Sequence, residues 1–268
     1  MKNKVLTGLL LVLIGGWGNL LAQNAGSNYA RQVNTLIGTK GVGLTSGYLY
    51  PGATYPYGMV QFTPSYFSKR SGFVINQLSG GGCEHMGNFP TFPVKGKLKM
   101  SPDNILNYRI NISEEKGHAG YYEAMVQEDI KAKLTVTERT GMASYEYPAD
   151  QQYGTVIIGG GISATPIEQA AIVITAPNKC EGYAEGGNFC GLRTPYKVYF
   201  VAEFDADALE SGTWKRDELK PNTTFAEGEY SGVYFTFDVS KKKNVQYKIG
   251  VSYVSVENAR ENLKTENS

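Results

Sequence analysis

The sequence predicts an all-β protein, an antiparallel β-sandwich, with one helical segment at its C-terminal end. Composition is the first reason. The 268 residues include 19 tyrosines, 11 phenylalanines and 32 glycines; aromatic residues favour strands, and glycine favours the turns that join them. Spacing is the second reason, because short runs of strand-forming residues recur at intervals of roughly 8 to 15 residues, as they do in sandwiches.

The strand pattern is clearest in the middle of the chain. Residues 130–137 alternate apolar and polar side chains with a period of two, which indicates a strand with one buried face. Residues 144–147 are expected to pair with this strand through a turn at Gly141. The same criteria predict strands at residues 59–63, 73–77, 97–100, 108–112, 122–126, 155–158, 171–175, 196–205, 232–238 and 245–256.

The tail of the chain has a helical pattern instead. Residues 257–268 contain good helix formers and no β-branched residue before Thr265. No capping residue closes this segment, so we expect it to be the beginning of a longer helical region.

The first 22 residues have the layout of a cleavable secretory signal. Lys2 and Lys4 give a short basic start, residues 5–14 form an apolar run, and cleavage is expected after Ala22. The apolar run is shorter than the about 20 residues that a membrane-spanning helix needs. We therefore expect a protein secreted to the periplasm or the extracellular space, without a membrane span after cleavage; an uncleaved anchor helix is the alternative.

The mature chain is nearly neutral. Removing residues 1–22 takes away Lys2 and Lys4 and no acidic residue, so the 26 basic side chains fall to 24 against 25 acidic ones. A neutral chain has no electrostatic footprint for nucleic acid or anionic lipid. Neutral sugars are partners that fit this charge.

Three cysteines stand in a compartment that is expected to be oxidising. Cys180 and Cys190 bracket residues 181–189, which are rich in glycine and are expected to form a loop, so the two thiols could meet. A disulfide between them would stabilise the fold by roughly 3 kcal/mol in the chain-entropy model, and Cys83 would be left over. Two free buried thiols are the alternative. The spacing of the cysteines and histidines does not resemble a zinc site.

A set of motifs in a fixed order carries a resemblance to a known family. They are VNTLIGT at residues 33–39, PGATYPYGMV at 51–60, SGF at 71–73, LSGGGC at 78–83, GYY at 120–122, YFVAEF at 199–204 and GVSYVSVENA at 250–259. From about residue 31 to the end, the chain resembles the N-terminal domain of glycoside hydrolase family 92, the α-1,2-mannosidase family. Members of that family open with VNPFIGT followed by PGAT-P-GMV.

The resemblance implies a division of labour. Residues 23–256 would form a β-sandwich of the galactose-mutarotase-like, or supersandwich, type, and residues 257–268 would begin a helical linker to an (α/α)6-barrel that this chain lacks. In the family the site lies between the two domains, and the reaction is the calcium-dependent, inverting hydrolysis of α-mannosides. Its acid and base belong to the barrel, so no catalytic residue is carried over, and the calcium ligands are expected mainly in the barrel.

The candidate substrate-binding residues follow from the same resemblance. Residues 79–89 match the segment of the sandwich that reaches the site in the family, and polar groups beside aromatic faces suit a sugar. A turn at residues 80–82 and a local salt bridge between Glu84 and His85 are the alternatives. The candidates are Glu84, His85 and Asn88 for hydrogen bonds, Phe89 and Tyr50 for stacking on a pyranose ring, and Cys83 beside them.

The chain also departs from the family pattern. Residues 74–77 read VINQ where the family usually has histidines, and Asn88 stands where an aspartate is usual. The sugar and the linkage therefore stay open. Two functions are expected: the sandwich half of a secreted exo-α-mannosidase, or a non-catalytic secreted sandwich that binds carbohydrate, which includes the remnant of an interrupted gene.

Overall fold

The computed structural model describes residues 29–39, 49–65, 72–79, 83–103 and 111–268. The predicted signal at residues 1–22, the glycines at 80–82 and most of the predicted strand at 108–112 lie outside these ranges. The chain divides into two compact units, residues 1–33 and 34–268. In the described part of the first unit, Tyr29–Gln32 forms the short 3-10 helix η1.

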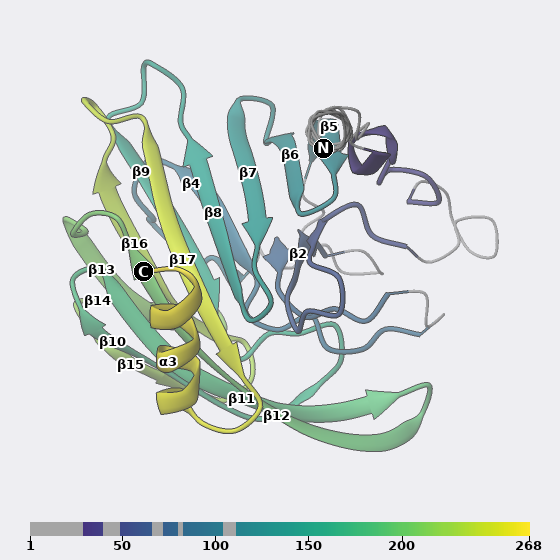
Figure 1. Ribbon diagram of the computed structural model, residues 1–268. Helices are drawn as coiled ribbons and strands as arrows, with labels where there is room; N and C mark the ends of the chain where they lie inside the picture. The colour runs from purple at the N-terminus through teal and green to yellow at the C-terminus, as the bar shows by residue number, and fades with distance from the viewer. Residues whose placement is uncertain (1–28, 40–48, 66–71, 80–82, 104–110) are drawn as a thin grey trace, which may run out of the picture. The chain divides into compact units, whose positions relative to one another are not determined.

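The second unit is a sandwich of two antiparallel sheets (Figure 1). One sheet has the order β1 (Ala53–Thr54), β2 (Gln61–Pro64), β3 (Phe73–Val74), β4 (Thr91–Lys95), β9 (Tyr153–Gly159), β16 (Ser231–Asp238), β13 (Glu210–Lys215), β14 (Glu218–Pro221). The other has the order β15 (Phe225–Glu227), β10 (Ile167–Ala176), β11 (Lys179–Phe189), β12 (Leu192–Phe204), β17 (Asn244–Ser252), β8 (Thr140–Glu146), β7 (Ile130–Val136), β6 (Tyr121–Val126), β5 (Ile112–His118). The predicted all-β antiparallel sandwich is confirmed.

Alternation along the strands builds the core. In β7 the side chains of Ile130, Ala132 and Leu134 are buried while those between them are partly exposed, as the period of two predicts. The predicted pairing with β8 is confirmed, but Gly141 lies in the ladder opposite Val136 rather than in the turn. A Cβ at this position would lie 2.9 Å from the Phe62 ring, so packing between the sheets explains this glycine.

A buried hydroxyl group joins the two sheets. The Tyr247 hydroxyl donates to Thr91 Oγ1 across 2.8 Å, and Thr91 Oγ1 lies 2.7 Å from the Tyr145 hydroxyl. Thr91 belongs to β4, and the two tyrosines come from β17 and β8 of the opposite sheet. Burial raises the pKa of Tyr145 and of Tyr247 well above the usual tyrosine range, and the hydrogen bonds to Thr91 oppose this rise for both phenols. Both phenols are therefore neutral and hydrogen-bonded within the core.

The predicted C-terminal helix is present as α3 (Val256–Glu266) and packs on the outer face of the second sheet (Figure 1). Ser255 caps its N-terminus by accepting from the Asn258 amide. Ala259 and Leu263 bury themselves against Val201 of β12, and a Cβ on residue 250 would collide with this helix. Among the described residues, no helix combines the length and the apolar character needed to cross a membrane.

The predicted loop at residues 181–189 is wrong, because these residues form most of β11. The glycines that suggested a loop serve close backbone approach, since a Cβ on Gly182 would collide with the Ala171 carbonyl oxygen. Residues ten apart in a strand are separated by roughly 33 Å, far beyond the Cα separation of about 7 Å that a disulfide tolerates.

The predicted bridge between Cys180 and Cys190 is therefore wrong as well. Cys180 faces the core as a buried free thiol. Cys190 instead forms a disulfide with Cys83, with 5.5 Å between their Cα atoms and a sequence separation of 107 residues. Cys83, which the prediction left unpaired, is the partner of Cys190.

We predict that Thr91→Val lowers the free energy of unfolding by about 1–3 kcal/mol. The two tyrosine hydroxyls could then pair with each other, but at least one hydrogen-bonding group would stay buried and unpaired. Urea denaturation measures the loss, and Thr224→Val, at an exposed position, is the matched control with an expected change within about 0.5 kcal/mol. Equal stability of the two variants would show that Thr91 does not join the sheets.

Candidate functional site

The predicted site residues gather at the connection between β3 and β4 and around Tyr50. Residues 83–89 of this connection, called the site loop below, carry five of the six candidates. Ser79, which precedes the loop, and Tyr50 line a cavity together. The structure thus gives two groups, one around His85 and one around Tyr50.

The backbone of the site loop is held in an unusual conformation. Met86 and Phe89 have φ values of 59° and 54°, and Gly87 lies between them at 75°. Left-handed conformations of residues other than glycine cost about 1–3 kcal/mol each, so surrounding contacts must hold them. The Ala164 amide donates to the Met86 carbonyl across 2.8 Å, which is one such contact.

Asn88 supplies a second contact by pairing with Asn76. The Asn88 amide donates to Asn76 Oδ1 across 2.8 Å, and Asn76 Nδ2 donates to Asn88 Oδ1 across 3.1 Å. Both side chains are buried. Asn76 also reaches the Tyr253 hydroxyl at 3.4 Å, and that hydroxyl lies 3.7 Å from the Met86 sulfur. This pairing braces the loop, and the Asn88 side chain also interacts with Tyr196 of β12.

His85 packs against the end of the β11–β12 hairpin, residues 188–193, called the hairpin tip below. Its ring centroid lies 5.2 Å from that of Phe189 and 5.6 Å from that of Tyr196. Its Nδ1 is 3.3 Å from the Asn188 carbonyl oxygen. Together with the Cys83–Cys190 disulfide, these contacts join the first half of the site loop to the hairpin tip, while Glu84 between them is half-buried.

The prediction that Phe89 stacks on a sugar is wrong. Its side chain is 0% exposed, and its ring centroid lies 4.2 Å from that of Phe200 in the core between the sheets. The backbone at Phe89 is left-handed, and its ring points inward, where burial of an aromatic side chain stabilises the fold more than a surface position would.

Tyr50 lies in a cavity of about 290 Å³. Burial raises the pKa of its phenol to about 12, against opposing hydrogen bonds to Thr54 and Ser79. The phenol is neutral at physiological pH and can both donate and accept a hydrogen bond. The cavity is lined by Asn34, Thr35, Ile37, Leu49, Tyr50, Gly52, Thr54, Ser79, His118, Ala119 and Gly120.

The lining has a chemical character of its own. It combines hydroxyl, amide and imidazole groups with apolar surface, and no carboxylate occurs among the described residues that line it. The motifs VNTLIGT and PGAT supply about half of the residues that line this cavity. Asn34, Thr35 and Thr54 could therefore have been recognised from the sequence as site residues, whereas the motifs served there only to identify the family. His118, whose ring stacks on Tyr121 with 5.0 Å between centroids, had no signal in the sequence.

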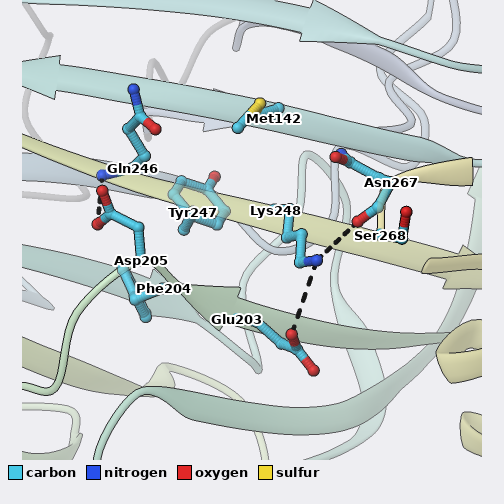
Figure 2. A pocket seen from close by; sticks show the side chains of 9 residues that line it. All are labelled: Met142, Glu203, Phe204, Asp205, Gln246, Tyr247, Lys248, Asn267 and Ser268. Atoms are coloured by element: carbon cyan, nitrogen blue, oxygen red, sulfur yellow. Dashed lines mark hydrogen bonds and ion pairs between the residues drawn. The ribbon is translucent and has the colours of Figure 1, made fainter. Parts of the chain in front are cut away.

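A second cavity of about 340 Å³ lies beside the end of α3 and holds two carboxylates (Figure 2). Each is already engaged. Glu203 pairs with Lys179 at 2.8 Å and with Lys248 at 3.9 Å, and Asp205 pairs with Lys242 and accepts from the Gln246 amide. Lys248 also donates to the Asn267 carbonyl across 2.6 Å. This cavity contains none of the predicted site residues.

The described residues show no cluster of acidic side chains that would suit a calcium ion. Calcium takes six to eight oxygen ligands, commonly from several carboxylates. Within the described ranges, no group of three or more His, Cys, Asp or Glu side chains gathers as metal ligands would.

Comparisons with protein families and with known sequences both find glycoside hydrolases. The family model described as the glycosyl hydrolase family 92 N-terminal domain matches residues 32–252. An "uncharacterized secreted glycosidase" from Arthroderma benhamiae is 25% identical over 273 residues, which cover 88% of this chain and 34% of that protein. The chain thus spans about a third of this relative.

Solved structures share the fold. The family GH92 alpha-mannosidase BT3965 from Bacteroides thetaiotaomicron is 24% identical with a TM-score of 0.75, covering 89% of this chain and 35% of that one. The family GH92 inverting mannosidase BT2199 from the same organism is 23% identical with a TM-score of 0.75, covering 91% and 34%. At these identities the likeness concerns the fold alone.

We predict that Phe89→Ala lowers the free energy of unfolding by about 3–5 kcal/mol, the cost of emptying a large buried aromatic position. Phe225→Ala is the matched control, because that ring is 54% exposed, and we expect little change in its stability. Thermal or urea unfolding of both variants makes the comparison. A stable Phe89→Ala protein that had lost sugar binding would restore Phe89 as a ligand contact.

Proposed function

The chain belongs to the glycosyl hydrolase family 92 N-terminal domains, and from that premise we propose that it is the carbohydrate-contacting sandwich of a secreted exo-α-mannosidase. The complete enzyme would be a calcium-dependent, inverting glycoside hydrolase whose acid and base, and most of whose calcium ligands, belong to an (α/α)6-barrel outside this chain. Solved relatives described as mannosidases, of which this chain covers about a third, support the proposal.

The cavity that holds Tyr50 is the observation that carries the proposal. A sugar offers hydroxyl groups that both donate and accept hydrogen bonds, together with an apolar ring face. Tyr50, Ser79 and Asn34 provide matching neutral groups, and the Tyr50 ring provides an aromatic face. Neutral partners on both sides avoid the cost of burying an unpaired charge.

The same cavity explains why this chain would not cleave its ligand. Inverting hydrolysis needs an acid that protonates the leaving oxygen and a base that activates water, about 6.5–9.5 Å apart. The described lining of the cavity holds neither, and Glu203 and Asp205 of the second cavity are held by lysines. The contribution of this chain is then to bind and orient the sugar beside groups supplied by the barrel.

Two exposed apolar side chains that line the cavity favour contact with a companion domain. Ile37 is 71% exposed and Leu49 is 41% exposed, and both line the cavity. Apolar side chains at the mouth of a polar cavity favour cover by another protein surface. Secretion is supported by the signal pattern at residues 1–22 and by the description of the relative from Arthroderma benhamiae as secreted.

We predict that methyl α-mannoside binds the isolated chain weakly, with a dissociation constant on the order of 1 mM, about −4 kcal/mol, because only part of the site is present. Resonances of Tyr50, Ser79 and His118 would shift in a two-dimensional NMR titration. Tyr50→Ala would abolish the shifts, and Tyr57→Ala, at a fully exposed tyrosine, would leave them unchanged.

The same samples test whether the hydrolytic chemistry belongs to the barrel and not to this chain. No mannose should be released from any α-mannoside by this chain alone. Turnover that disappears on replacing one carboxylate of this chain would contradict the assignment of chemistry to the barrel, and an absence of shifts at high sugar concentration would contradict the binding role.

A further inference from the structure

We propose that His118 is a hydrogen-bond acceptor for the sugar in the cavity around Tyr50, and that protonation of its ring weakens the binding of a neutral sugar there. The inference rests on the proposed function, because it concerns a contact with the same sugar. It adds a binding residue that the sequence did not indicate, and it makes the binding of the sugar depend on pH.

The β5–β6 hairpin places His118 at the cavity. His118 ends β5 and pairs with Tyr121 of β6 across a two-residue turn. Gly120 of this turn has a φ of 77°, a conformation that glycine adopts without strain. Its carbonyl oxygen accepts from Thr135 Oγ1 of β7 across 2.9 Å, so the end of the hairpin is fixed to the sheet.

Gly117 lets this hairpin approach the other walls of the cavity. A Cβ at this position would lie 2.4 Å from Thr35 Oγ1 and 3.6 Å from the Pro51 carbonyl oxygen. Thr35 lines the cavity, as do Tyr50 and Gly52 on either side of Pro51. A side chain at residue 117 would therefore separate the hairpin from these segments.

The ring of His118 is held by stacking on Tyr121, with 5.0 Å between the ring centroids and an angle of 19° between the rings. The Tyr121 hydroxyl donates to Glu123 across 2.7 Å. Glu123 also pairs with Lys131 at 3.3 Å and with Lys116 at 3.7 Å. These charged groups of β5, β6 and β7 are thus engaged with one another.

One hydrogen bond decides which ring nitrogen is available to a ligand. Nδ1 of His118 lies 3.0 Å from the Ala119 carbonyl oxygen. A carbonyl oxygen can only accept, so Nδ1 carries the proton of the neutral ring and Nε2 keeps its lone pair. Within the described ranges Nε2 has no hydrogen-bonding partner, which leaves it able to accept from a sugar hydroxyl.

Protonation removes this acceptor and adds a charge to the wall of the cavity. Imidazole is the side chain that ordinarily changes charge between about pH 5 and 8. The described residues that line the cavity include no carboxylate, and residues 34–37 and 49–54 carry no charged side chain. A sugar that covers the imidazolium would therefore remove water from a charge without supplying an opposite one.

The other titratable group among the described lining residues is the Tyr50 phenol. Burial raises its pKa to about 12, so it stays neutral over this range. The imidazole is then the group of the described lining whose charge changes.

An NMR titration of the chain with methyl α-mannoside at about pH 7.5 and at about pH 5 tests the proposal. The dissociation constant should rise about fivefold at the lower pH, which corresponds to the loss of one hydrogen bond. His118→Gln keeps an uncharged acceptor near the place of Nε2, so it should bind as the wild-type chain does at the higher pH and lose the pH dependence. His118→Asn, whose shorter amide reproduces only the place of Nδ1, should bind about fivefold more weakly at both pH values.

Nitrogen NMR of the imidazole gives a second readout that does not need the sugar. Nε2 of His118 should be unprotonated at the higher pH, and a proton found on it there would overturn the proposal. A pH dependence that persists in His118→Gln would overturn it as well. Binding with equal affinity at both pH values would overturn this inference alone, whereas no binding at either pH would overturn the proposed function and this inference with it.

Discussion

The sandwich depends on packing its two sheets against each other over an aromatic core that contains polar atoms. Thr91 joins the sheets within this core, because its hydroxyl forms hydrogen bonds with tyrosines from two strands of the opposite sheet. Tyr145 and Tyr247 bring large apolar area into the core, and each brings a hydroxyl that would be costly to bury alone. A threonine on β4 satisfies both, which fixes the position of β4 and of the connection that leads into it from β3.

That connection contains the site loop, and its two halves are stabilised by different kinds of interaction. Packing of Phe89 and the paired amides of Asn76 and Asn88 tie the second half to the core. A disulfide ties the first half to a hairpin whose strands belong to the other sheet. The loop thus bridges both layers, and the left-handed residues within it are held because both ends are fixed.

Much of the fold could be predicted from the sequence, since period-two alternation at residues 130–137 and the family motifs are local signals. β11 could not, because Gly182 is required by an approach of the neighbouring backbone that only the fold reveals. The disulfide was missed for a related reason: proximity in sequence favoured Cys180, while the true partner of Cys190 lies 107 residues away. Among the site residues, Tyr50 was identified and lines a cavity, whereas Phe89 was taken for a surface ring although its backbone turns it inward.

A crystal of this chain soaked with methyl α-mannoside tests most directly whether the sandwich meets its sugar through the cavity around Tyr50. We predict a pyranose ring against Tyr50, with hydroxyl groups within hydrogen-bonding distance of the neutral groups that line the cavity. A sugar bound instead in the cavity beside α3, or no ordered sugar at saturating concentration in crystals that leave the Tyr50 cavity open, would contradict this assignment.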